Sequence, residues 1–227
     1  MTAKHEGPYR TSARGDDESA PPRRGVEKVV TFAGAILVLV ILVVVVEAAT
    51  RGWRTEAAIA EARDVFAETL RDPSIARLTV RADPRSLAMP EPPELGVAQQ
   101  ADLGYVARSE RDRELPHDAR GLLLRAGARP RFDAAHVGLG RLAASGPEDV
   151  RWIGIVARET LHARYTYGAT SVDVERARIA IVDVVSGEIA ARITVEASPP
   201  AQTQSARDVY RLSPTQIGEA IAGALDD

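Results

Sequence analysis

The stretch VRWIGIVA, from Val150 to Ala157, specifies the sheet more strongly than any other part of the chain. Its large apolar side chains occupy both odd and even positions: Trp152, Ile153, Ile155 and Val156. Because side chains alternate between the two faces of a strand, such a run is typical of a strand that is covered on both sides. We therefore predict a central strand here, followed by a half-buried strand where apolar and polar residues alternate over residues 160–167.

A hairpin is predicted next, with strands over Arg178–Val185 and Glu188–Glu196 joined by Ser186-Gly187. The two-residue turn sets the pairs Val184 with Ile189, Val182 with Ala191, and Ala180 with Ile193. All six side chains then share one face. A shift of one residue would separate them, so the apolar pattern predicts this register.

The last helix is predicted over Ser213–Leu225. Ser213 is its N-cap, Pro214 takes the first helical position, and Gln216 completes a capping box three residues after the cap. An apolar stripe predicts that the helix packs on the sheet, and it consists of Ile217, Ile221 and Leu225.

Weaker patterns predict the remaining elements of the domain. They are strands at Ile75–Val80, Leu103–Ala107 and Leu122–Leu124, a helix capped by Asp133 over Asp133–Ala144, and loops at Asp83–Gln100 and Ser109–Asp118. Together the patterns predict an α+β domain over residues 75–227, with a mainly antiparallel sheet and helices packed on one face.

An uncharged stretch of eighteen residues, Val29–Val46, predicts a transmembrane helix. Bases are more frequent before this stretch than after it, which favours a cytoplasmic N-terminus and an exported C-terminal domain. Residues 1–28 are polar and predict a disordered cytoplasmic tail. Residues 47–72 predict a juxtamembrane amphipathic helix with the stripe Ile59, Ala62, Phe66 and Leu70. The alternative is a signal peptide cleaved near Ala48, which would release a secreted domain.

Composition excludes several classes of function. The chain has no Cys, so it has no disulfide, no thiolate nucleophile and no cysteine-bound metal. The whole chain has 29 basic and 32 acidic residues, and the two signs are interspersed along its C-terminal part, whereas a nucleic-acid surface needs clustered positive charge. The preference for Arg over Lys is typical of GC-rich coding and favours a bacterial source.

Recognisable catalytic and cofactor motifs are missing, and we expect neither a metal nor a cofactor. The four His residues lack zinc spacing, and the Glu-x-x-His at Glu159 and His162 occurs once, whereas di-iron sites use two copies. Gly138-x-Gly140-x-x-Ala143 matches the letters of a dinucleotide motif, but Gly146-Pro147 follows too soon for its long helix. We interpret these glycines as chance or as packing positions.

A charged surface is the one candidate site, and it comprises Glu159, His162, Arg164 and Asp173, with Glu175 nearby. Alternation places His162 and Arg164 opposite Tyr165 and Tyr167, so an open face there would suit a polar partner. We expect an anchored envelope protein that binds or positions a partner without catalysis, with the lipid bilayer contacted through residues 29–46. The alternative is an anchored hydrolase that uses carboxylates or His162.

Overall fold

The structure, a computed structural model, describes residues 53–91, 104–164, 171–198 and 209–226. The predicted span at residues 29–46 and the tail at residues 1–28 lie outside these ranges. Among the described helices, none has the length and apolar character needed to cross a bilayer.

A six-stranded sheet forms the centre of the domain, in the order β1-β5-β4-β3-β2, and β6 also pairs with β4. Its strands are β1 (Tyr105–Arg111), β2 (Arg120–Arg125), β3 (Val150–Arg164), β4 (Ser171–Asp183), β5 (Ile189–Ala197) and β6 (Val209–Tyr210). The long pairings β1–β5, β5–β4 and β4–β3 are antiparallel, whereas β2–β3 and β6–β4 are parallel. The predicted α+β class is confirmed, and β3 is an interior strand as expected.

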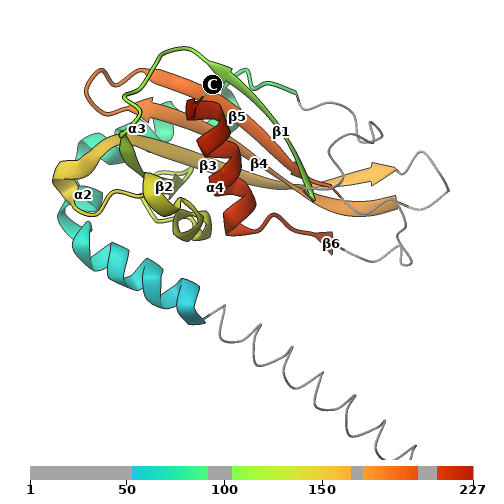
Figure 1. Cartoon of the computed structure of the whole chain (residues 1–227), viewed down its shortest axis with the longest axis horizontal. Coiled ribbons are helices and arrows are strands. Elements are labelled where there is room, and N and C mark those ends of the chain that lie inside the picture. The colour runs from blue at the N-terminus through green and yellow to red at the C-terminus, as the bar shows by residue number, and fades with distance from the viewer. Residues whose placement is uncertain (1–52, 92–103, 165–170, 199–208, 227) are drawn as a thin grey trace, which may run out of the picture. The chain divides into compact units, whose positions relative to one another are not determined.

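Helices cover both faces of the sheet, so the prediction of helices on one face is wrong (Figure 1). On one face lie α4 (Pro214–Asp226) and the 3₁₀ helices η3 (Ala134–Gly138) and η4 (Gly140–Leu142), while η5 (Pro147–Asp149) leads into β3. On the other lie helical residues 53–65, α2 (Ala67–Arg71), α3 (Pro73–Arg81) and the 3₁₀ helix η1 (Pro84–Ser86). The reason is that apolar side chains project from both faces of β2 and β3, so helices must shield each face from water.

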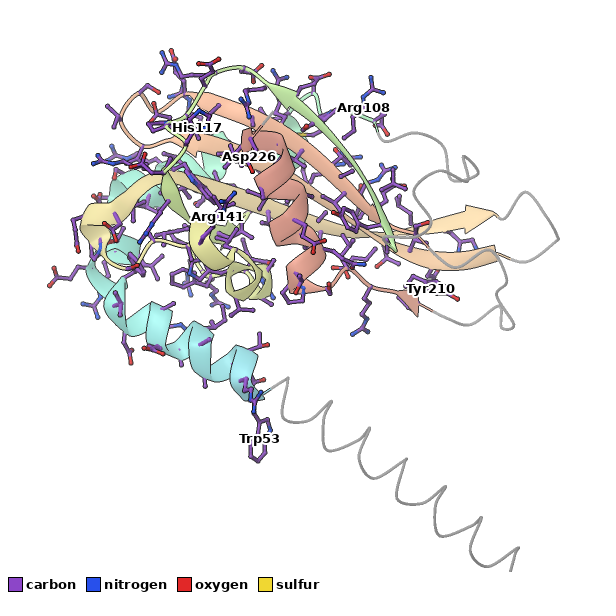
Figure 2. All side chains as sticks on the ribbon, in the orientation of Figure 1. Trp53, Arg108, His117, Arg141, Tyr210 and Asp226 are labelled. Carbon is purple, nitrogen blue, oxygen red and sulfur yellow. The ribbon has the colours of Figure 1, made fainter. Side chains whose placement is uncertain are left out.

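The N-terminal helices use the predicted stripe to cover their face. Phe66 is 2% exposed, and Ile59, Ala62 and Leu70 pack around the same cluster, whereas Trp53 projects into solvent with 76% exposed (Figure 2). The strand predicted at Ile75–Val80 is instead α3. Asp72 accepts a hydrogen bond from the backbone N–H of Ser74 at 2.8 Å, which caps a helix that begins at Pro73.

The hairpin between β4 and β5 has a different register from the one predicted. Ala180 lies opposite Arg192, Ile181 opposite Ala191, and Val182 opposite Ile189, with an irregularity between Ile181 and Val182. The connection is longer than two residues: the Asp183 carboxylate accepts from the Val185 N–H at 3.0 Å, and Gly187 adopts φ +70°. Since both faces are buried, either register buries apolar side chains, and the turn decides between them.

The C-terminal helix begins as predicted. The backbone N–H of Gln216 donates to Ser213 Oγ at 3.2 Å, and Gln216 Oε1 accepts from the Ser213 N–H at 2.9 Å. Residues 133–144 form two short 3₁₀ helices instead of one helix, although Asp133 does cap the first at the Ala135 N–H, at 2.9 Å.

Gly138 and Gly218 let η3 and α4 approach each other closely. A Cβ atom on Gly218 would lie 2.0 Å from the Gly138 carbonyl oxygen, and one on Gly138 would lie 1.9 Å from the Pro214 carbonyl oxygen. Both obstructing atoms belong to the backbone and cannot rotate away. Of the two interpretations of the motif glycines, chance or packing, close packing therefore applies to Gly138, whereas a Cβ atom on Gly140 would meet nothing within 4 Å.

We expect Gly218→Ala to lower the free energy of unfolding by about 1–3 kcal/mol, because the added methyl group overpacks this contact. Gly223→Ala on the same helix is the matched control. It meets no atom within 4 Å and should raise stability by about 1 kcal/mol through helix propensity. Urea unfolding of the full chain, followed by tryptophan fluorescence, measures both changes. Equal effects of the two substitutions would contradict the close approach.

Candidate functional site

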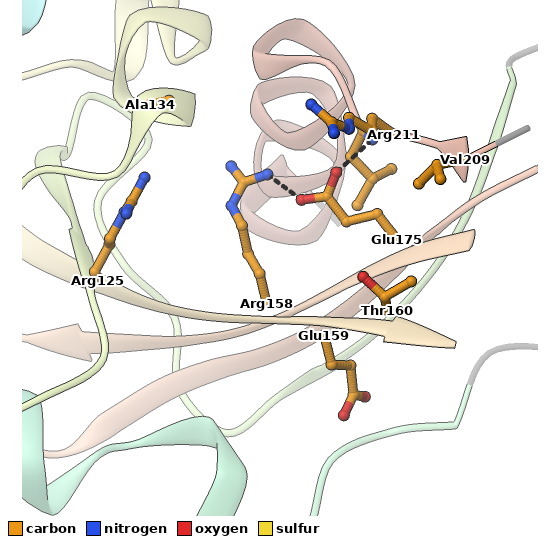
Figure 3. Close-up of a pocket in the computed structure, with 9 residues that line it drawn as sticks. Arg125, Ala134, Arg158, Glu159, Thr160, Glu175, Val209 and Arg211 are labelled. Carbon is orange, nitrogen blue, oxygen red and sulfur yellow. Dashed lines mark hydrogen bonds and ion pairs between the residues drawn. The ribbon is translucent and has the colours of Figure 1, made fainter. Parts of the chain in front are cut away.

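A cavity of about 520 Å³ lies at the end of the sheet on the α4 side. Its walls come from β2, β3, β4, β6 and the segment between β6 and α4, and they include Arg125, Arg158, Thr160, Glu175, Val209 and Arg211 (Figure 3). We call this cavity the arginine pocket. It is the part of this face where polar side chains replace the apolar ones under α4.

Arg158 is the hub of the arginine pocket. Its Nε donates to Asp133 Oδ2 at 3.1 Å and its Nη2 to Asp133 Oδ1 at 2.5 Å, while its Nη1 donates to Glu175 Oε1 at 2.5 Å. Burial alone would lower the pKa of Arg158, but its hydrogen bonds to Asp133 and Glu175 outweigh burial and raise the pKa. Arg158 is therefore a permanent cation that two carboxylates share.

Both carboxylates are also held by backbone groups. Asp133 is completely buried and its Oδ1 accepts from the Ala135 N–H, which orients it at the start of η3. Glu175 Oε2 accepts from the Leu212 N–H at 3.0 Å, and this bond ties the segment before α4 to β4. A buried carboxylate is stable only when it is paired and hydrogen-bonded, as both groups are here.

Two further guanidinium groups reach the arginine pocket with most of their donors unused. Arg125 has 62% of its side chain exposed, and its Nε lies 3.4 Å from Asp133 Oδ2. Arg211 is exposed and forms no ion pair with any residue that the structure describes. No sequence pattern marks Arg125, Arg158, Arg211 and Asp133 as one site, because strand pairing and the loop between β2 and β3 bring them together across long separations.

The predicted surface is divided between the two faces of the sheet. His162 lies opposite Asp173, and His162 Nδ1 is 2.6 Å from Asp173 Oδ1. Glu175 shares that face and lines the pocket. Glu159 points to the opposite face (Figure 3), where it pairs with Arg178 at 3.1 Å. Arg164 ends β3, and its side chain lies outside the described residues.

The His162–Asp173 pair is accessible to solvent. The His162 side chain is 72% exposed and the Asp173 side chain 43% exposed, and neither lines the arginine pocket. A hydrogen-bonded His and Asp is one part of a general-base arrangement, but catalysis also needs a nucleophile and a site that excludes water. In the described parts of the chain, no group of three His, Asp or Glu side chains is arranged to hold a metal ion.

Comparisons with known proteins give little further information. No family model matches the chain, and no curated protein matches it. Two solved structures of the PelC dodecamer from Paraburkholderia phytofirmans are similar to it. They match at TM-scores of 0.30 and 0.31 with 15% and 12% identity, and each covers 53% of this chain and 94% or 95% of the PelC chain. These values assign neither a family nor a function.

His136 lies on η3, three residues after Asp133, and is 6% exposed. Its ring is 4.7 Å from that of Phe132, and its Nδ1 accepts from the Leu123 N–H at 3.4 Å. Burial lowers the pKa of His136 from 6.5 to about 4, because the charged imidazolium would lose its hydration there.

The folded domain should lose stability as pH falls from 6.5 toward about 4, the interval in which the unfolded chain binds a proton at His136 and the folded chain does not. The loss attributable to His136 should reach about 2 kcal/mol at pH 5, with full stability above pH 6.5. His136→Leu should remove this part of the pH dependence. His117→Leu, at an exposed histidine, is the control and should leave it unchanged. Unfolding in urea at pH 7.5 and pH 5 tests this, and parallel pH profiles for wild type and His136→Leu would refute it.

Proposed function

We propose that the chain is a single-pass, membrane-anchored protein of the bacterial envelope, whose exported domain binds a partner without catalysing a reaction. The uncharged stretch at residues 29–46 supports the anchor, and the flanking bases support a cytoplasmic N-terminus. The arginine pocket is the binding site that this proposal assigns.

One observation carries the preference for binding over catalysis. The two acids that Arg158 binds, Asp133 and Glu175, are also fixed by backbone N–H groups. All four oxygens of these two carboxylates already accept hydrogen bonds within the protein, so neither carboxylate is free to contact a bound substrate. Arg125 and Arg211 in contrast offer unused donors, which suit recognition of a partner.

The second candidate is an anchored hydrolase that uses the His162–Asp173 pair. The 2.6 Å separation between the two side chains favours it, because an aspartate can orient the ring of a general-base histidine. Their solvent exposure favours simple binding instead. A third possibility is release of the domain by cleavage near Ala48, which would retain the pocket and remove the anchor.

The anchor predicts that the full chain stays in the membrane pellet after carbonate extraction. Replacing Leu39 and Val43 by Arg should move the chain to the soluble fraction, because two charges near the centre of the span cost several kcal/mol. Arginine at exposed Val65 and Val80 is the matched control and should not change the fractionation. A mature chain that begins near Ala49, measured by mass spectrometry, would support cleavage and reject the anchor.

The binding function predicts a position-specific crosslink in native membranes. A photoreactive amino acid at Val209, which is 48% exposed and lines the pocket, should capture a partner. The same probe at Glu188, in the turn at the opposite end of β4, should not. Adding Arg125→Glu and Arg211→Glu should abolish the crosslink, whereas His162→Ala should leave it unchanged. Equal crosslinking from both positions would reject the pocket as the binding site, and loss of a hydrolytic activity with His162→Ala would favour the enzyme.

A further inference from the structure

We propose that the arginine pocket takes a phosphate group, which Arg125 and Arg211 hold. This inference rests on the proposed binding function and names the chemical class of its ligand. It depends on which charges in the pocket are already neutralised, on where the free hydrogen-bond donors lie, and on which anion fits those donors.

The charge balance of the pocket leaves a positive surplus. Arg158 faces two carboxylates, so this group of three carries one negative charge. Arg125 offsets that charge from the protein's exposed side, at 3.4 Å from Asp133. The cation of Arg211 then remains, and Glu159, the remaining acid at the wall, points to the other face and pairs with Arg178.

The free donors approach the pocket from two sides. Figure 3 shows Arg125 and Arg211 on either side of Arg158, which projects from the sheet between them. Arg125 comes from β2 and Arg211 from the segment after β6. Arg158 itself has its Nε and both Nη atoms engaged with the two carboxylates, so it holds them in place, and of the outer arginines only Arg125 also lies near one of them, with its Nε 3.4 Å from Asp133 Oδ2.

A phosphate monoester matches this arrangement better than a carboxylate does. It carries about 1.5 to 2 negative charges at pH 7 and presents three acceptor oxygens, so it can accept from two guanidinium groups at once. A carboxylate has one charge and two oxygens, which a single arginine fork satisfies. The hydroxyl of Thr160, exposed at the pocket wall, is a further donor.

Titration calorimetry of the full chain in neutral detergent, at constant ionic strength, tests the proposal with inorganic phosphate as the probe. We expect saturable binding that Arg125→Gln and Arg211→Gln each weaken about tenfold and that the double substitution abolishes. Arg141→Gln is the matched control, because Arg141 is 79% exposed and lies outside the pocket, and it should bind as the wild type does. Absence of saturation, an equal loss with Arg141→Gln, or acetate binding as tightly as phosphate would overturn the proposal.

The same titration with glycerol phosphate and with dihexanoyl phosphatidate distinguishes a soluble ester from a lipid headgroup. Both compounds are used at concentrations below the critical micelle concentration of the phosphatidate. Tighter binding of the phosphatidate assigns a lipid headgroup, and equal binding assigns a soluble phosphate ester. A crosslink from Val209 in a chain that does not bind phosphate would reject the ligand class and retain the binding function. Loss of both would reject the pocket altogether.

Discussion

The end of the sheet depends on the guanidinium group of Arg158. Through Asp133 it fixes the start of η3, and through Glu175 it joins β3 to β4 and to the segment that leads into α4. Four separate parts of the chain therefore meet at one cation. Because buried carboxylates that lose their partner are strongly destabilising, none of these groups is free to change its role. The same hydrogen bonds that build this end of the sheet occupy all four oxygens of its two carboxylates.

Local sequence patterns predicted the elements whose signals are themselves local. The capping box at Ser213 and Gln216 and the stripe around Phe66 lie within a few residues, and both are present as predicted. The run from Val150 to Ala157 predicted an interior strand for the same reason. The strand predicted at Ile75–Val80 is wrong because Asp72 and Pro73, just before it, supply the N-cap and the first position of a helix.

Features set by both faces of the sheet could not be derived from one pattern. The hairpin register was wrong because Ile179 and Ile181 on one face and Ala180 and Val182 on the other are all buried. Burial then no longer distinguishes two registers that differ by one residue. The site shows the same effect: strand pairing brings His162 beside Asp173, whereas Glu159 has the opposite parity and faces away. The sequence around Asp133 predicted its role as a helix cap, but no local pattern predicted its ion pair with Arg158.

At this end of the sheet, the arginines on one face all have acidic partners, whereas on the other face one arginine has none among the described residues. This difference supports the second face as the proposed binding surface. On the Glu159 face, Arg176 pairs with Glu196 and also contacts Glu91 and Glu159, while Arg178 pairs with Glu159. Every one of those cations has an acid within the described residues. On the pocket face, Asp133 and Glu175 pair with two arginines, Arg125 and Arg158, and Arg211 is left over among the described residues. Arginines that already pair with acids interact only weakly with an added anion. An arginine without an acidic partner beside a cavity forms a new ion pair when an anion enters.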